Sequence, residues 1–138
     1  MSTNILLFLL PKKDVEYVLN TFTIRQTLEK MEFHHYSEIP VLDKEGKYVG
    51  SISDGDLLRV LKNNKIDWDE TMKMTVDKVP VLHDIKPIQI DKNMLDLVSI
   101  IINQNFVPVI DDMEHFIGII TRKSVIEYMD KILEKKDN

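Results

Sequence analysis

The stretch Gly50-Ser51-Ile52-Ser53-Asp54-Gly55-Asp56 decides the fold that this sequence predicts. It closes a β-rich run and places a hydroxyl and a carboxylate three residues apart, directly before an apolar run at 57–61. A serine followed by an acid at a helix start is a typical N-cap, because both side chains accept hydrogen bonds from free helical N–H groups. The same N–H groups suit a phosphate or a ribose oxygen. The stretch therefore predicts a strand, a glycine and a capped helix with an anion-binding start.

The same plan returns near the other end of the chain, at 116–129, and the two copies keep register. The offset is 68 positions for three pairs of landmarks: Pro40 and Pro108, Gly50 and Gly118, Ser53 and Thr121. Upstream the offset is 70: Val18 and Ile88, Leu28 and Val98, Met31 and Ile101. Because the difference of two falls in a loop between a helix and a strand, where a deletion is easiest, the halves form an internal repeat.

Each half has the order strand, helix, strand, strand, helix. In the first half we expect these elements at 15–19, 24–31, 38–42, 47–52 and 56–62. In the second half we expect them at 85–90, 94–102, 106–110, 116–120 and 124–133, with a frayed tail at 134–138. The proline at position 40 predicts an end or edge position for its strand. Trp68, in the polar connection 63–73, is interpreted as a hydrophobic clip that holds the connection to the body.

Length and composition limit the class of protein. The chain has 138 residues, 43% of them apolar and 30% charged, as in a globular protein. The formal net charge of −5 disfavours broad nucleic-acid binding, which needs a basic surface. The absence of cysteine excludes disulfides, zinc thiolate sites and cysteine nucleophiles, and it is compatible with a reducing cytoplasm. The apolar run at 5–10 is far shorter than the about 20 residues that span a bilayer, so we expect a cytoplasmic protein without a membrane segment.

Each half is small for an independent core, so we expect the halves to pack sheet against sheet. The predicted class is α/β (α+β), with tandem β-α-β-β-α repeats around a pseudo-twofold axis and two related clefts between them. We assign residues 1–62 to the first motif with its N-terminal segment, 63–75 to a linker and 76–138 to the second motif. Together they form one module.

Two tandem β-α-β-β-α units, each ending its third strand in Gly-x-x-Ser/Thr-x-x-Asp or a close variant, resemble the CBS domain pair, or Bateman module. The resemblance covers residues 10–129. It implies a regulatory module that binds an adenine nucleotide in its clefts, has no obligatory cofactor, often forms a homodimer and signals to a protein target, here unknown. In the family, the Ser/Thr and the Asp of the motif hold phosphate and ribose, respectively.

Carried over to this chain, the resemblance places Ser53 and Asp56 in a first site and Thr121 in a second. The second motif has Ser124 in place of the acid, and a serine cannot accept both hydroxyls of a ribose diol as a carboxylate does. Arg122 and Lys123 stand beside Thr121 at a helix start, where two cations and free N–H groups suit phosphate. Some free-standing CBS pairs of this size bind cyclic di-AMP, which has two phosphates and no free 2′,3′-diol. The second motif resembles a site for such a ligand.

The resemblance also implies cleft neighbours on the first half, where the first strand and the loop before the second strand hold the base. The corresponding residues are Lys13, Val15, Tyr36 and Ile39. Simpler interpretations stay open: a plain helix cap for Ser53 and Asp56, a solvated basic pair for Arg122 and Lys123, and a core aromatic for Tyr36. The acids at 54–56 lack the EF-hand pattern and the four histidines have no metal-ligand spacing, so no metal site is expected.

Three functions compete. The first is a stand-alone CBS pair that binds an adenine nucleotide, either AMP or ATP or cyclic di-AMP, and signals its level to a partner protein. The alternative is a structural or oligomerisation module with no retained ligand, which the loss of the acid at Ser124 favours. The third is a small nucleotide hydrolase. Because the sequence has no nucleophile elbow, Walker loop, dinucleotide glycine fingerprint or zinc-hydrolase signature, we do not expect an enzyme.

Overall fold

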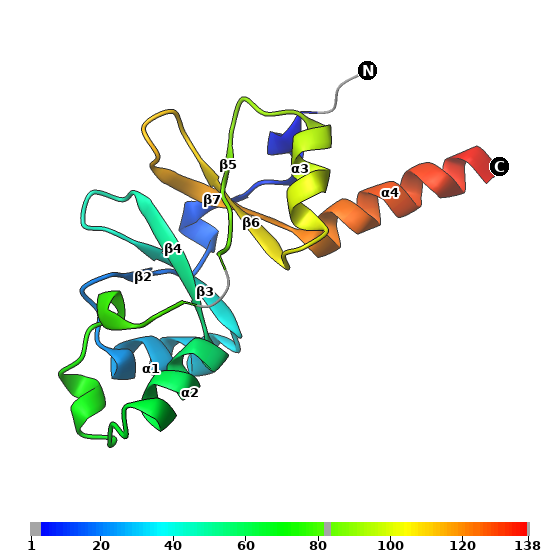
Figure 1. Cartoon of the computed structure of the whole chain (residues 1–138). Helices are drawn as coiled ribbons and strands as arrows, with labels where there is room; N and C mark the ends of the chain where they lie inside the picture. Colours follow the sequence, from blue (N-terminus) through cyan, green and yellow to red (C-terminus); the bar gives the residue numbers. More distant parts are fainter. Residues whose placement is uncertain (1–3, 82–83, 138) are drawn as a thin grey trace. The chain divides into compact units, whose positions relative to one another are not determined.

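The computed structural model describes residues 4–81 and 84–137, which form two compact units (Figure 1). The central unit comprises residues 16–84, and the terminal unit joins residues 1–15 to residues 85–138. Each unit has its own hydrophobic core and its own sheet. No helix in the described ranges has the length and apolar character needed to cross a bilayer.

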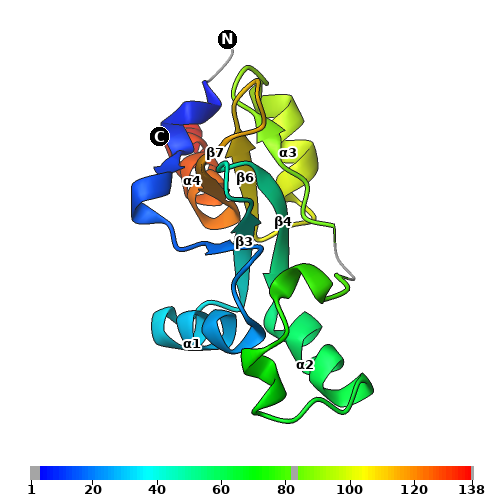
Figure 2. The same ribbon diagram turned by 90° about the vertical axis from the view of Figure 1, so that its left-hand side faces the viewer.

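The central unit contains the first β-α-β-β-α repeat. Its elements are β2 (Val18–Leu19), α1 (Ile24–His34), β3 (Glu38–Leu42), β4 (Tyr48–Ser53) and α2 (Asp54–Asn63), followed by short 3₁₀ turns at Glu70–Met72 and Val76–Lys78. The sheet has the order β2-β3-β4, with β2 parallel and β4 antiparallel to β3. Figure 2 shows α1 and α2 beside each other, and their apolar side chains close the core over β3 and β4.

The terminal unit contains the second repeat and the N-terminal segment. Its elements are the 3₁₀ turn Ile5–Phe8, β1 (Leu10–Pro11), the 3₁₀ turn Lys12–Asp14, β5 (Ile88–Gln89), α3 (Met94–Ile101), β6 (Phe106–Ile110), β7 (Phe116–Thr121) and α4 (Arg122–Asp137). The sheet has the order β1-β7-β6-β5, so the N-terminal strand β1 covers the edge of β7, to which it is antiparallel.

The strand registers confirm the internal repeat. Pro40 lies opposite Ser51 in the first sheet, and Pro108 lies opposite Ile119 in the second, each 68 positions later. The register shifts between Val41 and Leu42 and again at the corresponding residues of β6. The parallel pairs keep the second offset, since Val18 pairs with Val41 and Ile88 with Val109. The mixed α+β class and the tandem order of elements are therefore confirmed.

The prediction of an edge strand around Pro40 is wrong, because β3 is the middle strand of its sheet. The neighbouring strand β2 pairs only with Val41 and Leu42. Pro40 precedes that paired stretch, so on the β2 side its missing N–H leaves no ladder bond unmade. The same arrangement holds for Pro108, since β5 pairs only with Val109 and Ile110.

The N-terminal segment packs in the terminal unit, whereas the boundaries expected from the sequence grouped it with the first motif. Gly118 permits the close approach of β1 to β7. A Cβ on this residue would lie 2.2 Å from the carbonyl oxygen of Leu10 and 2.8 Å from Cδ1 of Leu9. At the corresponding Gly50, a Cβ would meet nothing within 4 Å. The two glycines thus have the same place in the repeat but different neighbours.

Two further expectations need correction. Trp68 is 56% exposed, so burial does not hold the connection. Instead the guanidinium of Arg25 lies 4.3 Å from the centroid of the Trp68 ring and donates hydrogen bonds to the Trp68 carbonyl and, at 3.2 Å, to the hydroxyl of Thr71. The C-terminal stretch expected to fray continues α4 as far as Asp137.

Candidate functional site

The first motif forms a reciprocal helix cap. Ser53 is the N-cap of α2, and its hydroxyl accepts a hydrogen bond from the Asp56 N–H at 3.0 Å. The Asp56 carboxylate accepts one from the Ser53 N–H at 2.9 Å through Oδ2. This capping box satisfies two backbone donors that the helix start leaves open. The structure therefore brings Ser53 and Asp56 together as predicted, in the geometry of a cap.

The other oxygen of Asp56 is held by an arginine of the same helix. Nη2 of Arg59 lies 2.6 Å from Oδ1 of Asp56, and the Asp56 side chain is only 1% exposed. The cavity beside this pair has a volume of about 120 Å³. Sequence reasoning missed Arg59, although an acid and a base three residues apart on a helix are neighbours.

The second motif has a simpler cap. The Thr121 hydroxyl accepts a hydrogen bond from the Ser124 N–H at 3.2 Å. The Ser124 hydroxyl donates to the Thr121 carbonyl at 2.8 Å. Ser124 has a single side-chain oxygen, so it does not offer the two acceptor oxygens with which a carboxylate receives a ribose diol.

Arg122 is the best-positioned cation of the second motif. Its Nε donates to the Ile101 carbonyl at 3.0 Å and its backbone N–H to the Asn105 carbonyl at 2.9 Å, which anchors both ends of the residue. Across the described ranges, no carboxylate forms an ion pair with Arg122. Lys123 is more loosely held, since its Nζ lies 4.0 Å from Glu127 and its side chain is 85% exposed. The helix start therefore carries one anchored cation and one exposed cation.

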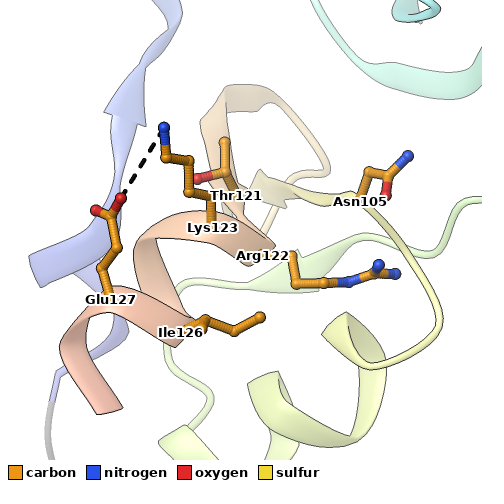
Figure 3. A pocket seen from close by; sticks show the side chains of 6 residues that line it. All are labelled: Asn105, Thr121, Arg122, Lys123, Ile126 and Glu127. Carbon is orange, nitrogen blue, oxygen red and sulfur yellow. Dashed lines mark ion pairs between the residues drawn. The ribbon is translucent and has the colours of Figure 1, made fainter. Parts of the chain in front are cut away.

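These residues surround a cavity of about 470 Å³ (Figure 3). Its walls are formed by Asn105, Thr121, Arg122, Lys123, Ile126 and Glu127. The structure thus brings three of the four predicted residues of the second motif together, and Ser124 lies outside the wall. Ile126 and Glu127 could have been inferred, because they follow the cations by one helical turn. Asn105 precedes β6 and carried no signal in the sequence.

The remaining predicted residues divide between the units. Lys13 is exposed in the 3₁₀ turn Lys12–Asp14, which lies against β7 in the terminal unit, and Val15 is buried directly after it. Tyr36 belongs to the central unit, where its side chain is half-buried and its phenol oxygen accepts a hydrogen bond from the Glu16 N–H at 3.5 Å. Ile39 is fully buried in the core of that unit. Lys13 and Val15 therefore share a unit with Thr121, and Tyr36 and Ile39 share one with Ser53.

Comparison with known proteins identifies the family. The CBS domain model matches residues 8–63 and 76–131, so the chain belongs to the CBS domain family and carries two copies in tandem. Cyclic di-AMP receptor B of Bacillus subtilis is 30% identical over 97 residues, which make up 70% of this chain and 65% of the receptor. The L-aspartate semialdehyde sulfurtransferase of Methanocaldococcus jannaschii is 30% identical over 95 residues, 67% of this chain but only 17% of that protein.

A solved structure extends the similarity to the whole fold. The crystal structure of CbpB in complex with c-di-AMP superimposes with a TM-score of 0.87 at 28% identity, covering 98% of this chain and 89% of that one. The chain spans less than two thirds of the length of the curated relatives that it matches. The match to the sulfurtransferase covers too little of that enzyme to indicate catalysis here.

Proposed function

We propose that this chain is a regulatory CBS pair that binds an adenine nucleotide, cyclic di-AMP, at the second motif. The observation that carries the proposal is Arg122, a guanidinium anchored beside a cavity of about 470 Å³ with no carboxylate partner in the described ranges. A volume of this size falls within the range of small-molecule sites, about 300–1,000 Å³. The similarity to CbpB and to the Bacillus receptor supports the same ligand.

The chemistry of the second motif suits a phosphodiester. The start of α4 presents the positive end of the helix dipole, and Arg122 offers a planar pair of Nη donors that suits the oxygens of a phosphate. Lys123 adds a second cation that is free to follow the ligand, because its contact with Glu127 is long and exposed. Ser124 lacks the two acceptor oxygens with which a carboxylate receives a ribose diol, and cyclic di-AMP has no free 2′,3′-diol to present.

Residues outside the cavity wall complete the proposed site. Lys13 lies in the segment that packs on β7, so it is a further cation of the same unit. Val15, in the same unit, is proposed to contact the base on the strength of the family resemblance. In the first half the same resemblance gives Tyr36 and Ile39 as the corresponding base-contacting positions. Ser53 and Asp56 form the corresponding motif of the first half.

The proposed mechanism is linkage between ligand and partner. A nucleotide that binds one arrangement of the two halves more tightly than another shifts the chain toward that arrangement, and a partner protein that reads it gains or loses affinity by the same factor. We propose that the chain acts as a cytoplasmic homodimer with a signalling role and no catalytic step. The competing function is a structural module without ligand, which the missing acid at Ser124 favours.

Isothermal titration with cyclic di-AMP, AMP and ATP tests the proposal. We expect cyclic di-AMP to bind the wild-type chain and Arg122→Ala to weaken binding by roughly 10- to 100-fold, since a charge-assisted hydrogen bond contributes about 1.5–3 kcal/mol. Arg122→Lys keeps the charge but loses the planar fork, so an intermediate affinity is expected. Lys131→Ala removes an exposed cation of the same helix about 13 Å away and serves as the control, with a change below about twofold. Absence of binding by the folded wild-type chain would instead favour the structural module.

A further inference from the structure

The carboxylate of the first motif, Asp56, already has hydrogen-bond partners within the protein. Both oxygens of the Asp56 carboxylate accept hydrogen bonds from the chain itself, Oδ2 from the Ser53 N–H at 2.9 Å and Oδ1 from Arg59 at 2.6 Å. The side chain is 1% exposed. A ribose diol would therefore have to compete with a backbone amide and a guanidinium for a buried carboxylate. The guanidinium carries a full positive charge whereas a diol is neutral, so the diol is the weaker donor in the competition with Arg59 for Oδ1.

The geometry of α2 allows the Arg59 side chain to contact Asp56, one turn earlier in the helix. Long side chains on a helix point toward its N-terminus, which carries the guanidinium over the first turn. Gly55 lies in that turn, and a Cβ on it would stand 3.3 Å from Nη1 of Arg59 and 3.7 Å from the Ser53 hydroxyl. Glycine is a poor helix former, and here its missing side chain leaves room for the guanidinium. The pairing thus follows from two residues of the motif's own helix.

The space around the first motif agrees with an occupied acid. The cavity beside Asp56 and Arg59 has about 120 Å³, against about 470 Å³ at the second motif. Small-molecule sites usually exceed about 300 Å³. Another cavity of about 250 Å³ lies along β4, but its walls include neither Ser53 nor Asp56, and its charged residue is Asp77, which repels phosphate.

We propose that the first motif is closed to nucleotides and that Arg59 is the specificity-determining residue that closes it. The inference rests on the proposed function of the second motif. Neither motif then presents a free carboxylate to a ribose diol, the first because Arg59 holds Asp56 and the second because Ser124 replaces the acid. The chain is thereby selective for a nucleotide whose ribose has no free 2′,3′-diol, and it binds one such ligand per chain.

Arg59→Ala tests the closure by gain of binding. Alanine keeps the helix, widens the cavity and removes the guanidinium that donates to Oδ1 of Asp56. We expect AMP to bind the variant at least roughly tenfold more tightly than the wild type, and Asp56→Asn in the same variant to abolish the gain. Lys62→Ala, which removes an exposed cation from the same helix, is the control and is expected to leave AMP binding unchanged. A folded Arg59→Ala chain without this gain overturns the closure.

Amide chemical shifts of the unmodified chain give an independent measurement that needs no variant. On titration with AMP, the amides of Gly55 and Asp56 are expected to stay in place, and their movement at millimolar AMP or below would overturn the closure. On titration with cyclic di-AMP, the amides of Arg122 and Lys123 are expected to move. If those two stay in place while Arg59→Ala gains AMP, the proposed function fails and the closure of the first motif stands.

Discussion

Substitution of Gly118 by alanine is expected to detach the N-terminal segment from β7, and Gly50 provides a matched control. Both glycines have nearly the same positive φ, 155° and 157°, so the backbone strain of a side chain, about 1–3 kcal/mol, is common to both variants. Only the surroundings differ. The added methyl group would lie 2.2 Å from the Leu10 carbonyl oxygen in one case and would meet nothing within 4 Å in the other.

The expected difference in unfolding free energy between the two variants follows from the contacts that β1 loses. Ordinary contact at 3.4 Å requires the segment to retreat by about 1.2 Å. That movement breaks the ladder between Leu10 and Ile119, worth about 1 kcal/mol for each of about two hydrogen bonds. Strain from overpacking adds about 1–3 kcal/mol at a site that cannot yield fully. We therefore expect Gly118→Ala to lose about 3–5 kcal/mol more unfolding free energy than Gly50→Ala.

Urea unfolding followed by far-ultraviolet circular dichroism measures both losses. If the proposed site is correct, Gly118→Ala also weakens cyclic di-AMP binding, because Lys13 moves with the segment, whereas Gly50→Ala leaves that binding unchanged. Equal losses of stability in the two variants would refute the reasoning, since they would show that backbone strain alone accounts for the effect.

Two further substitutions test other parts of the structure. Arg25→Ala is expected to lower the unfolding free energy by about 1–2 kcal/mol, because it removes both the contact with the Trp68 ring and hydrogen bonds to the connection. It is also expected to shift the fluorescence of the single tryptophan. Unchanged emission and stability would contradict this role. Desolvation acts to raise the pKa of Asp111, but hydrogen bonds from the backbone N–H groups of its turn, that of His115 foremost, hold this pKa below its usual value. The stabilisation from this carboxylate is therefore complete above pH about 4 and is lost as the pH falls through the lowered pKa. Asp111→Asn is expected to make the unfolding free energy less dependent on pH in this acidic range. An unchanged pH dependence, or the same change in the control Asp112→Asn, would contradict the assignment.

Local patterns predicted the repeat well, because each signal lies within one element. The Ser53 cap, the glycine before it and the alternation along the strands depend on neighbours in the sequence, and their offsets of 68 and 70 positions survive as strand registers. Pro40 misled the prediction because a proline reveals that an N–H is missing, but not how far the neighbouring strand extends.

Contacts between distant segments carried no comparable signal. The two-residue strand β1 is too short for a periodic pattern, and its partner Ile119 is more than a hundred positions away. Asn105 takes part in the candidate site through its carbonyl group, which every residue possesses. The ion pair between Arg59 and Asp56 is a different case, because the spacing of three residues is visible in the sequence. The sequence does not show whether the partner of Asp56 is a ligand or this arginine.

The division of the chain has a consequence for the order of folding during synthesis. The central unit is continuous, so it can fold as soon as residues 16–84 have left the ribosome. The terminal unit needs the first residues of the described chain together with the last strand, so β1 has no strand to pair with until β7 emerges. The apolar residues around Ile5 and Leu10 therefore stay uncovered until β7 has emerged, and closing so long a loop slows their docking. A nascent chain arrested before residue 116 is expected to hold a folded centre and an exposed, chaperone-accessible N-terminal segment.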